Sequence, residues 1–185
     1  ETCSDDGQAW ENPTPCEDNE TCSNGACVTL CSFAEANKSS VGCQYYAIDA
    51  NNDPVENYDT QPYAVVVSNV QEDVTANVEV QEHDGNDWIM VQNAAVDPQD
   101  LHQFDLPDKH IDYTGINQRG AYRVVSDVPI IAYQFQPVNG ETSFTSDASL
   151  LLPVSVLDQF YYVIGWGAQS FGNPQLNIVA AEDGT

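Results

Sequence analysis

Apolar and polar residues alternate along much of this chain. In residues 74–80 every second residue is apolar (Val74, Ala76, Val78 and Val80), the pattern of a strand with one buried and one solvated face. The polar run HDGND at residues 83–87 predicts a turn, and residues 88–92 are then expected to return as the second strand of a hairpin. No segment shows a sustained 3.6-residue repeat, so the pattern favours strands over helices.

The stretch from residue 120 to residue 153 organises the rest of the chain. Residues 121–126 and 130–136 are two apolar strands rich in β-branched and aromatic residues, separated by Asp127-Val128-Pro129. A second apolar run, residues 149–152, follows a polar excursion. We expect the two long strands to form the centre of a β-sheet.

Other apolar runs bounded by turn-forming residues predict further strands. They are residues 41–49, 63–68, 102–106, 160–166 and 176–181. The predicted fold class is therefore all-β, an antiparallel β-sandwich with a small disulfide-rich module at its N-terminal end.

The last residues predict an unfinished hairpin. Residues 177–181 form the expected strand, and Glu182-Asp183-Gly184-Thr185 is a turn that would lead into a partner strand. We expect the sandwich to be incomplete at the C-terminus. Either the sequence is part of a longer one, or another subunit supplies the missing strand.

All six cysteines lie in the first 43 residues, among polar and turn-forming residues. They are Cys3, Cys16, Cys22, Cys27, Cys31 and Cys43. A segment this short and polar cannot fold by apolar burial alone, so we expect disulfides and an oxidising compartment. Zinc is the alternative, but pairs at two-residue spacing and a nearby histidine are both lacking. We predict a Cys31–Cys43 bridge, with the other four cysteines cross-linking the N-terminal module.

The charge of the chain is strongly one-sided. There are 29 Asp and Glu residues and 4 Lys and Arg residues, a formal net charge of −25. Such a field repels phosphate, which argues against nucleic acid and anionic lipid as partners. The acids form either a solvated coat, the interpretation we favour, or a cation-binding surface. No apolar run approaches the ~20 residues of a membrane span.

Two loops carry clustered oxygen ligands for calcium, the one cofactor that the sequence suggests. One contains Asp84, Asn86 and Asp87, and the other contains Asp49, Asn51 and Asp53. Asp, Asn and Gly are also the residues that tight turns require, so a simple turn is the default interpretation of both loops. His83, His102 and His110 lie among acids, but their spacing matches no metal-ligand pattern.

Aromatic residues offer a second kind of candidate site. Trp166, Trp88 and Phe171 could stack on a sugar or a peptide, and Trp166 lies between two glycines that leave its indole accessible. Packing within the sheet is the alternative. The four basic residues, Lys38, Lys109, Arg119 and Arg123, are each expected to pair with a carboxylate. Arg123 lies in the middle of a strand, so its side chain should either extend to the edge of the sheet or bridge to an acid.

Four segments carry a resemblance to a known family. SSVGCQYYAID, YAVVVSN, GAYRVVSDVPIIAYQFQPVN and SDASLLLPVSVLDQFYYVIGW resemble the N-terminal domain of IgGFc-binding proteins, over residues 31–185. That family is known from secreted mucin-like animal proteins and from surface proteins of myxobacteria. The leader that ends in CSNGAC looks like a small EGF-like module, which gives an expected division into residues 1–31 and 32–185.

The resemblance implies a non-enzymatic, extracellular adhesion or binding module on a bacterial surface, whose partner is a protein or a glycan. No G-x-S-x-G motif is present, and no carboxylate pair is singled out among the acids. The alternative is a structural subunit that binds copies of itself, assembling into an extracellular filament by pairing of strand edges.

Overall fold

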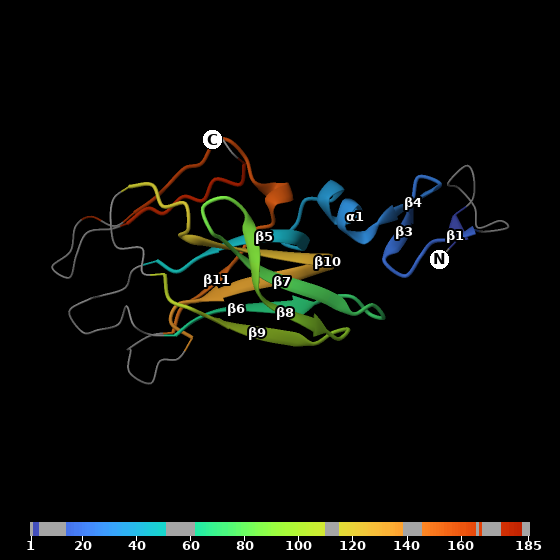
Figure 1. The fold of residues 1–185 in the computed structure, drawn as a ribbon. Helices are drawn as coiled ribbons and strands as arrows, with labels where there is room; N and C mark the ends of the chain where they lie inside the picture. Colours follow the sequence, from blue (N-terminus) through green and yellow to red (C-terminus); the bar gives the residue numbers. More distant parts are fainter. Residues whose placement is uncertain are drawn as a thin grey trace.

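The N-terminal end of the chain is a small module of short strands. The computed structural model describes residues 2–3, 14–50, 62–109, 115–138, 146–165, 167 and 175–182. β1 (Thr2–Cys3) pairs with β2 (Thr14–Pro15), and β3 (Glu20–Ser23) pairs with β4 (Ala26–Thr29), both antiparallel. Asn24 and Gly25 have positive φ, the conformation that a tight turn between β3 and β4 requires. The module lies at one end of the molecule (Figure 1).

A short helix, α1 (Leu30–Ala36), joins this module to the sandwich (Figure 1). The Thr29 side chain caps it by accepting a hydrogen bond from the Ser32 N–H, at 3.1 Å. At seven residues the helix is too short to produce a sustained 3.6-residue repeat, so the sequence pattern did not predict it.

In the described part of the chain, the body of the protein is an antiparallel sheet of seven strands. Its strands are β5 (Gly42–Ile48), β6 (Tyr63–Asn69), β7 (Ala76–His83), β8 (Trp88–Val96), β9 (Leu101–Leu106), β10 (Ala121–Phe135) and β11 (Ala148–Leu150). A 3₁₀ turn, η2 (Val154–Val156), follows β11. The predicted hairpin is confirmed, because β7 and β8 pair from His83–Trp88 to Ala76–Val96.

The central strand β10 divides this sheet into two layers. Its first half pairs with β5 and β7, and its second half pairs with β6 and β11. The register shifts between Val125 and Ile130, at the break that the sequence predicted, although β10 continues through the break as one strand. The carboxylate of Asp127 fixes the shifted segment by accepting hydrogen bonds from the backbone and side-chain nitrogens of Asn77. One layer thus contains β5, the first half of β10, β7 and β8. The layer that faces it contains β11, the second half of β10, β6 and β9.

The core between the layers is built from alternate residues of these strands. It contains Tyr45, Ala47, Tyr63, Val65, Val67, Ala76, Val78, Val80, Val96, Phe104, Leu106, Tyr122, Val124, Val128, Ile130, Ala132 and Leu151. Ala76, Val78 and Val80 are the residues that the alternation placed on the buried face. The predicted all-β sandwich with a disulfide-rich N-terminal module is confirmed.

Two predicted strands are wrong for the residues that the structure describes. Residues 160–165 and 176–181 have no regular secondary structure, although their composition is that of strands. Both belong to the C-terminal part of the chain, which runs along the β5 side of the sandwich (Figure 1). Strand propensity alone does not supply a neighbouring strand, and without one a strand does not form.

Candidate functional site

The cysteines are joined in disulfides rather than arranged as metal ligands. Cys31–Cys43 is confirmed and ties the start of α1 to the start of β5, while Cys16–Cys27 closes the N-terminal module. Cys22 is also disulfide-bonded, and the side chain of Cys3 lies outside the described residues. The donor atoms of Cys16, Glu20 and Cys27 lie within 4.8 Å of one another. Because the two sulfurs are bonded to each other, they are not free to bind zinc as thiolates.

The loop after β7 is a hydrogen-bonded turn. The Asp84 carboxylate accepts from the N–H groups of Asn86 and Asp87, at 2.8 and 2.9 Å. These two backbone N–H groups lower the pKa of Asp84, and nearby His83 and Arg119 lower it further. The turn accounts for the sequence at this position, and a calcium ion bound by Asp84, Asn86 and Asp87 stays a prediction.

Asp49, the first residue of the other predicted calcium loop, is buried with only 4% of its surface exposed. Its carboxylate accepts hydrogen bonds from the Lys109 backbone N–H and the Gln136 side chain, both at 2.7 Å. It therefore joins the end of β5 to the residue that follows β10 and to the segment after β9. Asn51 and Asp53 lie outside the described residues.

Trp88 lies on the outer face of the first layer, in a packed cluster. The Arg123 guanidinium lies 4.5 Å from the centre of its ring, and the rings of Tyr46 and His83 lie 5.7 and 5.2 Å from it. Arg123 Nε also donates to Gln81 Oε1, at 2.7 Å. Packing is therefore the better interpretation of Trp88. Trp166 and Phe171, the other two aromatic candidates, lie outside the described residues.

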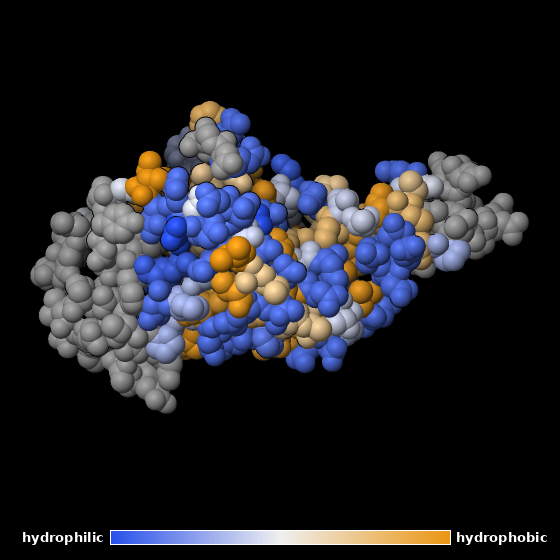
Figure 2. Space-filling model, in the orientation of Figure 1, coloured by the Kyte–Doolittle hydropathy of each residue, from blue (hydrophilic) through white to orange (hydrophobic). Residues whose placement is uncertain are grey.

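The expectation that each basic residue pairs with a carboxylate holds for Lys109, whose Nζ lies 2.9 Å from Glu82 Oε2. Pairing with a carboxylate is wrong for Arg123 among the described residues, because its guanidinium stacks on Trp88 instead. The face in Figure 2 is mostly hydrophilic, with a small apolar patch over β8, where Ile89 and Met90 are exposed. His102 packs edge-on against Phe104, and His110 lies outside the described residues.

The largest departure from ordinary burial is a run of five apolar residues after η2, the segment 160–164. Phe160, Tyr162 and Ile164 are 85, 102 and 97% exposed, and the intervening Tyr161 and Val163 are 63 and 62% exposed. The exposure alternates with a period of two, as in an extended chain with one face turned outward. A contiguous exposed apolar surface of this kind is a candidate contact with another molecule. We refer to it as the apolar segment.

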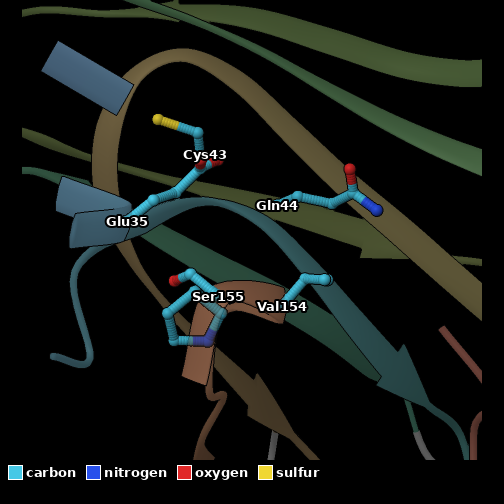
Figure 3. Close-up of a pocket in the computed structure, with 6 residues that line it drawn as sticks. Glu35, Cys43, Gln44, Val154 and Ser155 are labelled. Atoms are coloured by element: carbon cyan, nitrogen blue, oxygen red, sulfur yellow. The ribbon is translucent and has the colours of Figure 1, made fainter. Parts of the chain in front are cut away.

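A cleft of about 350 Å³ lies beside the outer edge of β5 (Figure 3). α1, β5 and η2 line it with Glu35, Cys43, Gln44, Pro153, Val154 and Ser155. The close approach of η2 depends on Gly42, where a Cβ atom would lie 2.4 Å from Pro153 Cβ. No pattern in the sequence indicated this cleft, because it joins segments more than 100 residues apart.

The outer edge of β5 next to this cleft has no strand partner among the described residues, although η2 packs against Gly42 and the Tyr46 hydroxyl donates to the Ala181 carbonyl, at 3.4 Å. The Ile48 and Ala50 N–H groups point away from the β10 strand half that pairs with β5, and donate to the side chains of Gln134 and Gln136. In an antiparallel ladder the N–H groups of Gln44 and Tyr46 point the same way. No strand in the described part of the chain pairs with this edge.

Comparisons with known proteins leave the function open. No protein-family model matches the sequence, and no curated protein matches it. A solved structure, titled "Crystal Structure of Thermotoga maritima 1070", is similar with a TM-score of 0.37 and 11% sequence identity. The match covers 61% of this chain and 95% of that chain, and at this score it carries no functional argument. Among the described residues, no helix is long and apolar enough to span a membrane.

Proposed function

We propose that this chain is a non-enzymatic extracellular binding module that contacts its partner through the apolar segment. The observation that carries the proposal is the exposure of Phe160, Tyr162 and Ile164, which are 85, 102 and 97% exposed. In water such side chains are unfavourable unless a partner covers them, since burying one stabilises a complex by about 1.5–3 kcal/mol. A resemblance to IgGFc-binding N-terminal domains supports the same class of function.

The charge pattern supports the assignment of this segment as the contact. From Gln159 to Ala181 the sequence contains no Asp, Glu, Lys, Arg or His, in a chain of net charge −25. Charged residues are depleted at the centre of protein interfaces, and a strongly charged surface elsewhere keeps the module soluble. The disulfides and the acidic surface are consistent with an extracellular location.

The proposal is tested by the binding of purified protein to immobilised mucin, collagen, immunoglobulin and an oligosaccharide array. We expect saturable binding to at least one of these probes, weakened about 10- to 100-fold by I164D, as for loss of one buried aliphatic side chain. I116D is the matched control, because Ile116 is 94% exposed but lies outside the apolar segment. An equal effect of the two substitutions, or no saturable binding to any probe, would contradict the proposal.

The alternative function is a structural subunit that assembles by pairing of strand edges. The observation that favours it is that the chain carries both an apolar segment of strand composition and an open strand edge, that of β5 in the described part of the chain. Sedimentation or light scattering distinguishes this alternative from a monomeric binding module.

A further inference from the structure

We propose that two copies of this chain exchange their apolar segments, each segment adding as a strand to the outer edge of the other copy's β5. The inference rests on the assignment of the apolar segment as a contact and develops the alternative function, because it makes another copy of this chain the partner of that segment. It names the donor, the acceptor and a closed two-fold arrangement.

The donor is preorganised for strand addition. Phe160, Tyr162 and Ile164 lie on one side of the segment, as the alternation of their exposure with that of Tyr161 and Val163 indicates. The Tyr161 hydroxyl accepts a hydrogen bond from the Asp158 N–H, at 2.7 Å, which fixes the chain where the segment begins. An edge-added strand of this kind gains main-chain hydrogen bonds along its length and side-chain contacts at alternate residues.

The acceptor is the first half of β5. Gln134 and Gln136 occupy the N–H groups of Ile48 and Ala50, so the backbone donors left for an incoming strand are those of Gln44 and Tyr46. The cleft lined by Gln44, Val154 and Ser155 lies beside these groups (Figure 3) and has room for one large side chain. This combination of open backbone and adjacent pocket is how strand-addition sites achieve both affinity and specificity.

Charge permits a second copy as the occupant, and the proximity of donor and acceptor on one copy favours it. Both β5 (GCQYYAI) and the apolar segment are uncharged, so they can meet although the remaining surfaces of two copies, at −25 each, repel. The donor also leaves the fold next to its own acceptor, because η2 lines the cleft and the segment begins four residues after η2. Donor and acceptor close together on one copy allow both exchanges at once around a two-fold axis.

The buried area is sufficient for such a dimer. An aromatic side chain buries about 150–250 Å², so Phe160 and Tyr162 of two copies would bury about 600–1,000 Å². Ile164, the added backbone and the covered part of β5 bring the total towards the ~1,200 Å² at which standard interfaces begin.

The first experiment is sedimentation equilibrium of the full chain in 0.15 M and 1 M NaCl. We expect about twice the 20.2 kDa chain mass, with tighter association at high salt because repulsion between the copies is screened. I164D should weaken the dimer about 100- to 10,000-fold, because the substitution occurs twice in a two-fold dimer, and I116D should leave it unchanged. A monomer under all conditions, or a dimer insensitive to I164D, would overturn the exchange. A mass that keeps increasing with protein concentration would contradict a closed dimer.

A second pair of variants tests the acceptor. Q44P removes the N–H group offered to the incoming strand but none that pairs with β10, whereas Q44A keeps it. We expect Q44P to weaken the dimer more than about tenfold relative to Q44A, and equal dimer strength would overturn β5 as the acceptor. If the protein is monomeric but I164D still weakens binding to the immobilised probes, the exchange fails and the proposed function stands. If I164D abolishes the dimer but does not change binding to the immobilised probes, the exchange stands and the proposed contact with an external partner is contradicted.

Discussion

Three tyrosines, Tyr45, Tyr63 and Tyr122, are fully buried in the core, and each places its hydroxyl on a polar partner at the edge of the core. Tyr45 donates to the Ile130 carbonyl, Tyr122 to the Pro107 carbonyl, and Tyr63 to Gln134. Burial raises the pKa of all three above the ordinary value of 10.0, and nearby Asp49 adds to this for Tyr63 and Tyr122.

This predicts a loss of stability in alkali. Because the folded-state pKa values exceed the unfolded ones, the contribution is fully present below about pH 10 and is lost as the pH rises above it. Each tyrosine should contribute a slope of about 1.4 kcal/mol per pH unit to the free energy of unfolding. Urea titrations from about pH 8 to about pH 11.5 measure the slope, which Y122F should reduce. A free energy of unfolding that does not change over that pH range would contradict the prediction.

The lowered pKa of Asp84 predicts the opposite pH dependence, a loss of stability in acid. Its pKa is lowered by the Asp87 and Asn86 N–H groups, so its contribution is present above the ordinary value of 3.8 and is lost as the pH falls through the lowered pKa. D84N keeps the turn-capping oxygen but has no charge. We expect the melting temperature of the wild type to exceed that of D84N at about pH 6 and to match it near pH 2. A difference independent of pH would show that charge is irrelevant at this turn.

At the scale of elements, the sequence predicted what depends on local pattern. Alternation identified the buried face of β7, and the Asp127-Val128-Pro129 break coincides with the register shift in β10. It did not predict α1, which has only two turns, or the cleft, which depends on contacts between distant segments. Strand composition at residues 160–164 was recognised, but whether a partner strand exists is a property of the three-dimensional fold. The exposed segment was therefore mistaken for an ordinary strand.

The close packing of η2 against β5 predicts that one added methyl group lowers the stability of the fold. G42A would place a Cβ 2.4 Å from Pro153 Cβ and 3.0 Å from its Cγ, so η2 must move away from the sheet. We expect a loss of about 1–3 kcal/mol in the free energy of unfolding, the range for overpacked sites. Urea unfolding measures it, with G167A as the matched control, because nothing lies within 4 Å of a Cβ at that position. Equal stability of the two variants would contradict the packing argument.

At the scale of the whole molecule, the acids and the apolar segment have opposite effects on association. The acidic surface separates copies of the protein and keeps the exposed apolar side chains from non-specific aggregation. The uncharged run from Gln159 to Ala181 leaves one region where another molecule can approach. Self-repulsion at −25 also destabilises each folded copy, because the charges lie closer together in the folded than in the unfolded chain.

Salt should therefore stabilise the fold at neutral pH. Raising NaCl from 0.1 M to 1 M shortens the Debye length from about 10 Å to about 3 Å, which screens repulsion between the acids. We expect the melting temperature of I164D, chosen so that association does not contribute, to rise on the order of 5 °C at pH 7. At pH 4.1, the sequence pI, the net charge is near zero and the same salt series should have little effect. An equal rise at both pH values would mean that salt acts on apolar burial instead. If calcium chloride at matched ionic strength gives a larger rise than NaCl, the folded protein binds calcium, because screening alone depends only on ionic strength.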